Sequence, residues 1–215
     1  MAIQLIGYPI STCTLRVIAT LKELGVSYEI TPPSDFSELK TPEYLATKHP
    51  FGKIPVLIDD GFKIYESRAI IRYLVNKYQG KKNSTILIPT DVQKAGLVEQ
   101  FISVESSYYD EAVHKLVAQE VFTKFHGKTP DPEIVKEARV EIGKVLDVYE
   151  KLLEGKDYLT GEFSLADISH YPYTYYSISS GHGDLWEKRP NVARWWKNIS
   201  EREVWKGIVA ELNQK

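Results

Sequence analysis

Residues 50–68, PFGKIPVLIDDGFKIYESR, constrain the fold more than any other stretch of the chain. The runs 56–58 and 62–65 are rich in β-forming residues and are joined by Asp59-Asp60-Gly61, which predicts an antiparallel hairpin with a three-residue connection. A helical pattern of apolar residues starts directly afterwards, at Ala69. This stretch therefore predicts a turn, a hairpin and the start of a helix.

The same stretch has the features of a ligand cradle. Pro55 opens the first strand and donates no ladder hydrogen bond, and an X-Pro bond can be cis, so the backbone of Ile54 can face outward and pair with an extended peptide. Ser67 places a hydroxyl and free backbone N–H groups at a helix N-terminus. That arrangement is suited to binding a carboxylate.

Upstream, the chain predicts a strand over 3–7, a helix over 14–25 and a second strand over 26–30. A β-α-β unit of this kind favours a parallel strand pair. Followed by the hairpin and its helix, the order is thioredoxin-like. Ser11 lies in the loop before the first helix.

Beyond residue 80 the composition changes. We expect a linker over 81–90 and helices over 91–215, so the predicted domains are 1–80 and 91–215. Thr90 and Gln93 form a candidate capping box for a long helix. Pro130 and Pro132 precede a second long helix, and Pro190 marks a last one.

Ser164 and Asp167 form a second candidate capping box, with Phe163 and Ile168 placed as a hydrophobic staple. We therefore expect Asp167 to be structural rather than catalytic, although it is a carboxylate in an apolar context.

Composition excludes several classes of function. A net charge of −2 with dispersed lysines and arginines gives no basic surface for nucleic acid. One cysteine allows no internal disulfide, and the absence of a signal pattern or long apolar span favours a cytoplasmic protein with no membrane role. The five histidines have no metal-ligand spacing, so no metal site is expected.

Three motifs together resemble the glutathione transferases, most closely the phi class: GYPISTCTLRV at 7–17, PFGKIPVL and KIYESRAI. The resemblance implies a thioredoxin-like α/β N-terminal domain followed by an all-α C-terminal domain. It also implies glutathione as co-substrate, a small apolar electrophile as second substrate, and a role in detoxification. A homodimer is implied as well, with Arg68 and the helix from Val92 as candidate contacts.

Within that resemblance, Ser11 is the catalytic serine. A free thiol with a pKa of about 8.5 is mostly protonated at neutral pH, so the enzyme must stabilise the thiolate. A serine hydroxyl at a helix start can donate a hydrogen bond to sulfur. Taken alone, Ser11 and Thr12 would be interpreted as a simple helix cap.

The resemblance also assigns glutathione-binding residues. Glu66 and Ser67 hold the γ-glutamyl end, Ile54 beside Pro55 forms the backbone clamp, and Lys40 and Lys53 face the glycine carboxylate. Leu39 stands where family members often carry a histidine, which removes one donor. Solvated surface charges are the alternative interpretation of both lysines.

The electrophile pocket is expected between the two domains and consists of apolar side chains that do not identify the electrophile. Core packing is the alternative for each of them. The candidates are Ile10, Phe36, Tyr108, Phe122, Tyr175 and Tyr176, with Tyr171 as a further aromatic of the same stretch.

Two other functions remain open at this level. The first is a non-catalytic carrier of apolar ligands or an interaction module on the same fold. The second is a glutathione-dependent thiol-disulfide reductase that works through Cys13, whose thiol lies near a helix N-terminus. An idle buried thiol is the simpler interpretation of Cys13.

Overall fold

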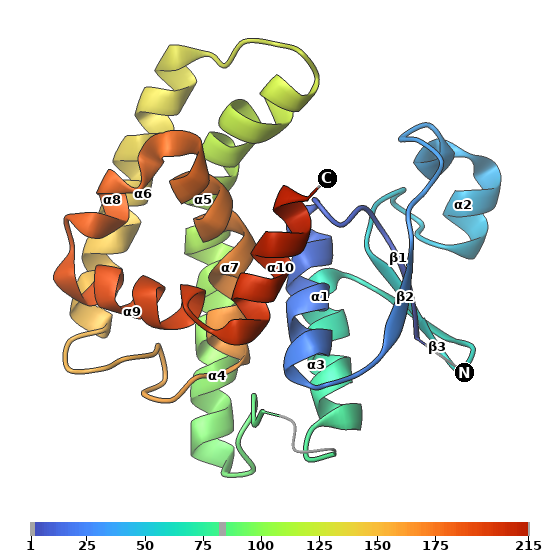
Figure 1. The fold of residues 1–215 in the computed structure, drawn as a ribbon, viewed down its shortest axis with the longest axis horizontal. Coiled ribbons are helices and arrows are strands. Elements are labelled where there is room, and N and C mark those ends of the chain that lie inside the picture. Colours follow the sequence, from blue (N-terminus) through green and yellow to red (C-terminus); the bar gives the residue numbers. More distant parts are fainter. Residues whose placement is uncertain (1–2, 82–84, 215) are drawn as a thin grey trace. The chain divides into compact units, whose positions relative to one another are not determined.

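The computed structural model describes residues 3–81 and 85–214, and the chain divides into two compact units (Figure 1). The first contains the described residues up to Leu87 and those from Glu203 onward; the second is Ile88–Arg202. Of the expected linker 81–90, residues 82–84 lie outside the described residues. Thr85 and Leu87 are held by the first unit, because the Thr85 hydroxyl donates to Glu23 and the Leu87 N–H donates to Gln79.

The first unit is a four-stranded sheet with helices. Its elements are β1 (Ile3–Ile6), α1 (Thr12–Glu23), β2 (Tyr28–Thr31), η1 (Glu38–Lys40), α2 (Pro42–Thr47), β3 (Val56–Asp59), β4 (Phe62–Tyr65), α3 (Ser67–Tyr78) and α10 (Glu203–Asn213).

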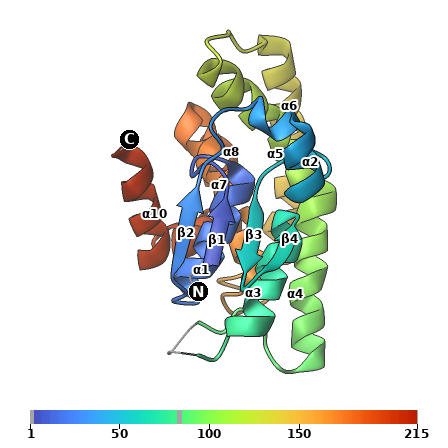
Figure 2. The same cartoon turned by 90° about the vertical axis from the view of Figure 1, so that its right-hand side faces the viewer.

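The strand order is β2-β1-β3-β4, with β1 parallel to β2 and antiparallel to β3 (Figure 2). This confirms the predicted thioredoxin-like arrangement. Helices α1 and α3 pack against each other on one face of the sheet. Strand β2 starts later than predicted, because the Val26 N–H still donates to Leu21 at the end of α1.

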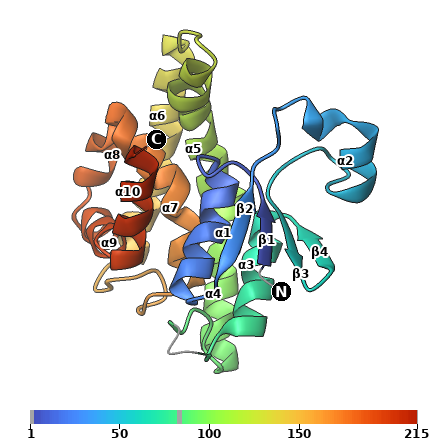
Figure 3. The same cartoon turned by 45° about the vertical axis from the view of Figure 1, so that its right-hand side comes forward.

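The β3–β4 hairpin is tighter than the sequence suggested (Figure 3). Asp59 pairs with Phe62, so the connection contains two residues, Asp60 and Gly61, rather than three. Both have positive φ, 49° and 83°, as a type I′ turn requires.

The sequence predicts that the helix from Pro190 is the last one, and this prediction is wrong. Helix α10 follows it and packs on α1, where Glu211 pairs with Lys22. The division into units therefore differs from the expected domains in this element. Trp205 and Ile208 are the buried residues of α10.

The second unit is helical. Its elements are α4 (Val92–Val104), η2 (Glu105–Tyr109), α5 (Asp110–Val117), η3 (Ala118–Thr123), α6 (Pro132–Leu152), α7 (Leu165–Ser177), η4 (Ile178–His182), α8 (Asp184–Glu187) and α9 (Pro190–Ser200). Segments η2 and η3 have wider, π-helical turns. Helix α6 lies alongside α5 (Figure 1).

Helix α4 is capped by a different residue from the one predicted. The Asp91 carboxylate, not Thr90, accepts a hydrogen bond from the Lys94 N–H at 2.9 Å. Asp131 caps α6 in the same manner, and Pro132, which the sequence placed just before this helix, is its first residue.

Asp167 has the structural role that the sequence predicted. It is fully buried and accepts hydrogen bonds from the Ser164 N–H at 2.9 Å, the Leu159 N–H at 3.1 Å and the Trp195 indole at 2.9 Å. These bonds join the start of α7 to the preceding loop and to α9. Burial is the main cause that raises the pKa of Asp167 from 3.8 to about 6, while the hydrogen bonds lower it.

Candidate functional site

Ser11 is the residue immediately before α1, with extended backbone angles of φ −69° and ψ 131°. Its carbonyl accepts from the Leu15 N–H at 2.8 Å, which starts the helix. Its hydroxyl makes no capping hydrogen bond to the first turn. The half-buried side chain is therefore positioned as a cap but is not used as one, so no capping bond holds the hydroxyl against the helix and it can turn toward a ligand.

Glu66 and Ser67 lie side by side at the start of α3. Glu66 has φ 70° and ψ 107°, unusual for a residue other than glycine, and its side chain extends into solvent. Ser67 is the first residue of α3 and is buried. An exposed carboxylate thus stands beside a buried hydroxyl at a helix N-terminus, a pair that is complementary to an ammonium group and a carboxylate.

Arg16, a residue that the sequence analysis missed, lies beneath this pair. It is fully buried in α1, and its NH1 donates to Ser67 Oγ at 2.8 Å. The same nitrogen is 3.9 Å from Cys13 Sγ. A charged residue among the buried residues of a helix was the available signal, but its partner is 51 positions away.

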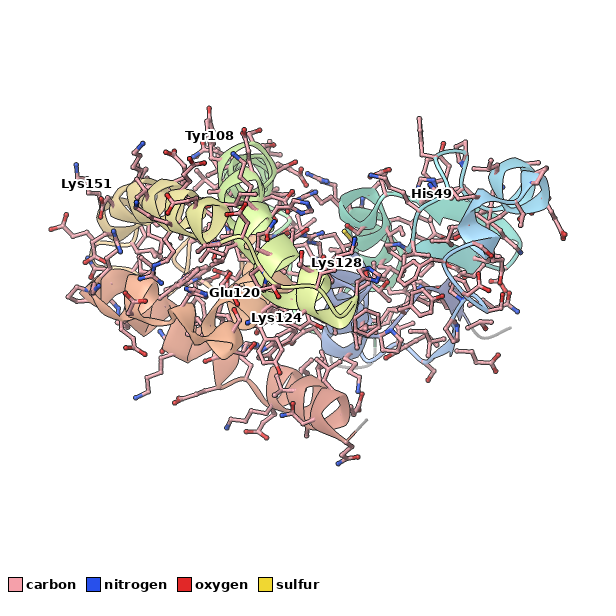
Figure 4. All side chains as sticks on the ribbon, turned by 90° about the horizontal axis from the view of Figure 1, so that it is seen from above. His49, Tyr108, Glu120, Lys124, Lys128 and Lys151 are labelled. Carbon is pink, nitrogen blue, oxygen red and sulfur yellow. The ribbon has the colours of Figure 1, made fainter. Side chains whose placement is uncertain are left out.

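His49 is the second missed residue and lies beside the sheet of the first unit (Figure 4). It is buried, its Nδ1 accepts from the Phe51 N–H at 3.2 Å, and its Nε2 is 3.7 Å from Glu66 Oε1. Burial is the main cause that lowers the pKa of His49, while Glu66 raises it. The buried imidazole thus lies next to the Glu66 carboxylate.

The turn before β3 presents main-chain groups. The Ile54–Pro55 peptide bond is cis, and Pro55 is buried. Among the described residues, no backbone hydrogen bond of Ile54 is found. The preceding carbonyl, of Lys53, accepts from the Tyr44 hydroxyl at 2.9 Å, which anchors the turn to α2.

Lys40 and Lys53 are both exposed. Lys40 Nζ donates to the Gly52 carbonyl at 3.2 Å, so it lies over the turn that contains Ile54. Gly52 has φ +60°, and a Cβ there would lie 2.4 Å from the Leu39 carbonyl oxygen. Leu39 itself is the buried residue of η1.

The sequence matches two family models, "Glutathione S-transferase, N-terminal domain" over residues 5–82 and "Glutathione S-transferase, C-terminal domain" over 113–203. Glutathione S-transferase F10 of Arabidopsis thaliana is 40% identical over 209 residues, which is 95% of each chain. The chain belongs to the glutathione S-transferase family. Its relatives are of the phi class, as the motifs indicated.

Two solved structures support this membership. Glutathione transferase F7 from Populus trichocarpa superposes with a TM-score of 0.91 at 38% identity, covering 97% of this chain and 98% of that one. Maize glutathione S-transferase I in complex with an atrazine glutathione conjugate gives 0.88 at 32% identity, with coverage of 98% and 97%. The transferase function and the two-part fold predicted from the sequence are therefore confirmed.

In this glutathione transferase, the electrophile-pocket candidates do not form one cluster within either unit. Ile10 and Phe36 are exposed in the first unit, and the Phe36 ring lies 5.1 Å from that of Tyr8. In the helical unit, the Tyr175 and Tyr176 rings are 5.3 Å apart, and both side chains are half-buried, as is Phe122. Burial raises the pKa of both tyrosines.

Tyr108 projects outward from the helical unit (Figure 4). It lines a groove of about 390 Å³ with Val145, Val148 and Leu152 of α6. Neither Phe122 nor the Tyr175–Tyr176 pair lines that groove. Val145 and Leu152 are thus groove residues, whereas Leu146 of the same helix is buried.

Within residues 3–81 and 85–214, no three histidine, cysteine, aspartate or glutamate side chains lie close enough to hold a metal ion. In the same part of the chain, no helix is both long and apolar enough to cross a membrane.

Proposed function

We propose that this protein attaches the thiol sulfur of glutathione to small apolar electrophiles, and that Ser11 stabilises the reacting thiolate. The uncommitted hydroxyl of Ser11 carries the proposal. A serine that capped its own helix would have its side chain turned toward the backbone N–H groups of the first turn. Here the hydroxyl can donate to a sulfur anion at the positive end of α1.

The chemistry needs a modest electrostatic effect. Each unit by which the pKa of the bound thiol falls corresponds to about 1.4 kcal/mol of preferential binding of the anion. A hydrogen bond to a charged group contributes roughly 1.5–3 kcal/mol, so one hydroxyl is enough to bring the thiol pKa from about 8.5 to near 7.

The tripeptide is bound along the first unit. The γ-glutamyl ammonium pairs with Glu66, its carboxylate with Ser67 and the α3 N-terminus, and the cysteinyl backbone with Ile54 next to Pro55. Lys40 and Lys53 face the glycine carboxylate. This orientation follows from charge complementarity, and the complex of the maize relative with an atrazine glutathione conjugate supports glutathione as the ligand.

For the electrophile, the helical unit offers the half-buried Tyr175–Tyr176 pair, whose rings are 5.3 Å apart, and the half-buried Phe122. The enzyme acts in the cytoplasm as a homodimer. Exposed apolar side chains on α4 support association, in particular Val92, whose side chain is 84% exposed, and Leu97.

A conjugation assay with an activated aryl halide tests the proposal. Wild-type protein should form the thioether with saturable dependence on glutathione, and Ser11→Ala should lower kcat/KM by about a hundredfold. Thr12→Ala is the matched control, because Thr12 is a buried neighbour that the proposal gives no role. Equal activity in Ser11→Ala and wild type would contradict it.

A further inference from the structure

We propose that Arg16 is a positioning residue for glutathione, which fixes the Ser67 hydroxyl so that its O–H points at the γ-glutamyl carboxylate. The inference rests on the proposed function and assigns a role to a residue that contacts no substrate. It follows from the Arg16–Ser67 hydrogen bond.

The geometry of this pair is set by packing. Arg16 belongs to α1, Ser67 begins α3, and these two helices pack against each other. Both side chains are buried, and the NH1 to Oγ distance is 2.8 Å. A buried hydrogen bond with a charged donor at this distance is among the stronger kinds in proteins.

The donor and acceptor roles in this bond are unambiguous. A guanidinium group has only N–H donors, so Ser67 Oγ must be the acceptor. A serine hydroxyl has a single hydrogen, and that hydrogen remains for another partner. Arg16 therefore forces Ser67 to act as a donor, which is what a carboxylate requires.

Electrostatics act in the same direction. An arginine side chain keeps its positive charge when buried, and this charge lies directly under the N-terminal turn of α3. The helix N-terminus already favours an anion. The two contributions favour the carboxylate, and not the ammonium group, at Ser67, while the exposed Glu66 carboxylate favours the ammonium group.

Two glutathione analogues separate this role from a structural one. In 4-aminobutanoyl-cysteinyl-glycine the γ-glutamyl carboxylate is missing, and in glutaryl-cysteinyl-glycine the amino group is missing. Binding of glutathione and both analogues should be measured by calorimetry for wild type, Arg16→Lys and Ser67→Ala.

We expect Arg16→Lys to raise the Kd of glutathione and of the deaminated analogue roughly tenfold, the size of a lost charge-assisted hydrogen bond. The Kd of the decarboxylated analogue should stay within about twofold, and kcat at saturating glutathione should be unchanged. An equal loss for all three ligands, or no loss for any, would overturn the proposal.

Ser67→Ala distinguishes this inference from the proposed function. If wild type does not bind glutathione, or Ser67→Ala weakens all three ligands equally, the proposed binding mode is wrong. If Ser67→Ala discriminates against the carboxylate and Arg16→Lys does not, only the role of Arg16 is wrong.

A second measurement uses wild-type protein, in case Arg16→Lys does not fold. The side-chain N–H resonance of Arg16 should shift when glutathione or the deaminated analogue binds, and should not shift with the decarboxylated analogue. Identical shifts with all three ligands, or none with glutathione, would contradict the coupling through Ser67.

Discussion

Replacing Asp167 tests the account of the helical unit quantitatively. Asp167→Ala removes the capping interaction at Ser164, which contributes about 1 kcal/mol. It also leaves the buried Leu159 N–H and the Trp195 indole N–H without their acceptor, at about 1 kcal/mol each. The free energy of unfolding at pH 7 should therefore fall by about 3 kcal/mol.

The loss should also depend on pH. The pKa of Asp167 is about 6 in the folded protein, against 3.8 for the ordinary side chain, so between these values the folded state holds more protons than the unfolded state. The contribution of this group to stability is full below pH 3.8 and is lost as the pH rises through 6. Its total is about 3 kcal/mol. Lowering the pH from 7 to 5 should thus stabilise wild type, relative to Asp167→Ala, by about 1 kcal/mol.

Urea unfolding followed by circular dichroism at pH 5, 6 and 7, with all proteins at one concentration, measures these differences. Asp167→Asn is the matched control, because it keeps an acceptor for Leu159 and Trp195 but does not titrate. It should lose less stability than Asp167→Ala, and the difference in unfolding free energy between these two variants should be independent of pH. A stable Asp167→Ala protein that had lost only activity would refute the structural role.

Three further predictions concern single residues. Cys13→Ser should keep conjugation activity within about threefold, because Ser11 and not the thiol is the proposed active group. Loss of activity in Cys13→Ser, with full activity in Ser11→Ala, would favour the thiol-disulfide reductase function. Gly52→Ala should lower the unfolding free energy by about 3 kcal/mol or more, since its Cβ would lie 2.4 Å from the Leu39 carbonyl oxygen. Gly25 also has positive φ, +64°, but nothing lies within 4 Å of its Cβ position, so Gly25→Ala should cost only about 1 kcal/mol. Equal melting temperatures of the two variants would contradict this. Asp91→Ala should cost about 1 kcal/mol in thermal unfolding and Thr90→Ala almost nothing, because only Asp91 accepts from Lys94; the reverse order would restore the cap predicted from sequence.

Local chemistry explains which features the sequence could predict. The hairpin, the Ser164–Asp167 box and the break at Pro130 to Pro132 before the second long helix depend on residues within a few positions of one another, and all three were predicted. The exact turn length was not, because Asp59 can end the strand or start the turn, and only its pairing with Phe62 decides this.

Features that depend on distant partners were missed. Arg16 and Ser67 are 51 positions apart, and His49 and Glu66 lie on either side of the β3–β4 hairpin in the sequence. A helical pattern read for its apolar face gives no partner to a buried arginine. Helix α10 was overlooked although Trp205 and Ile208 have helical spacing, because Pro190 gave a stronger signal for the helix before it.

The most direct test of the central claim is the pKa of the glutathione thiol bound to the enzyme. Thiolate absorbance in the ultraviolet, titrated from pH 5 to 9 with wild type and Ser11→Ala, measures it. The account predicts a pKa of about 7 or below in wild type and a return toward about 8.5 in Ser11→Ala. A bound thiol with the same pKa in both proteins would contradict the role of Ser11.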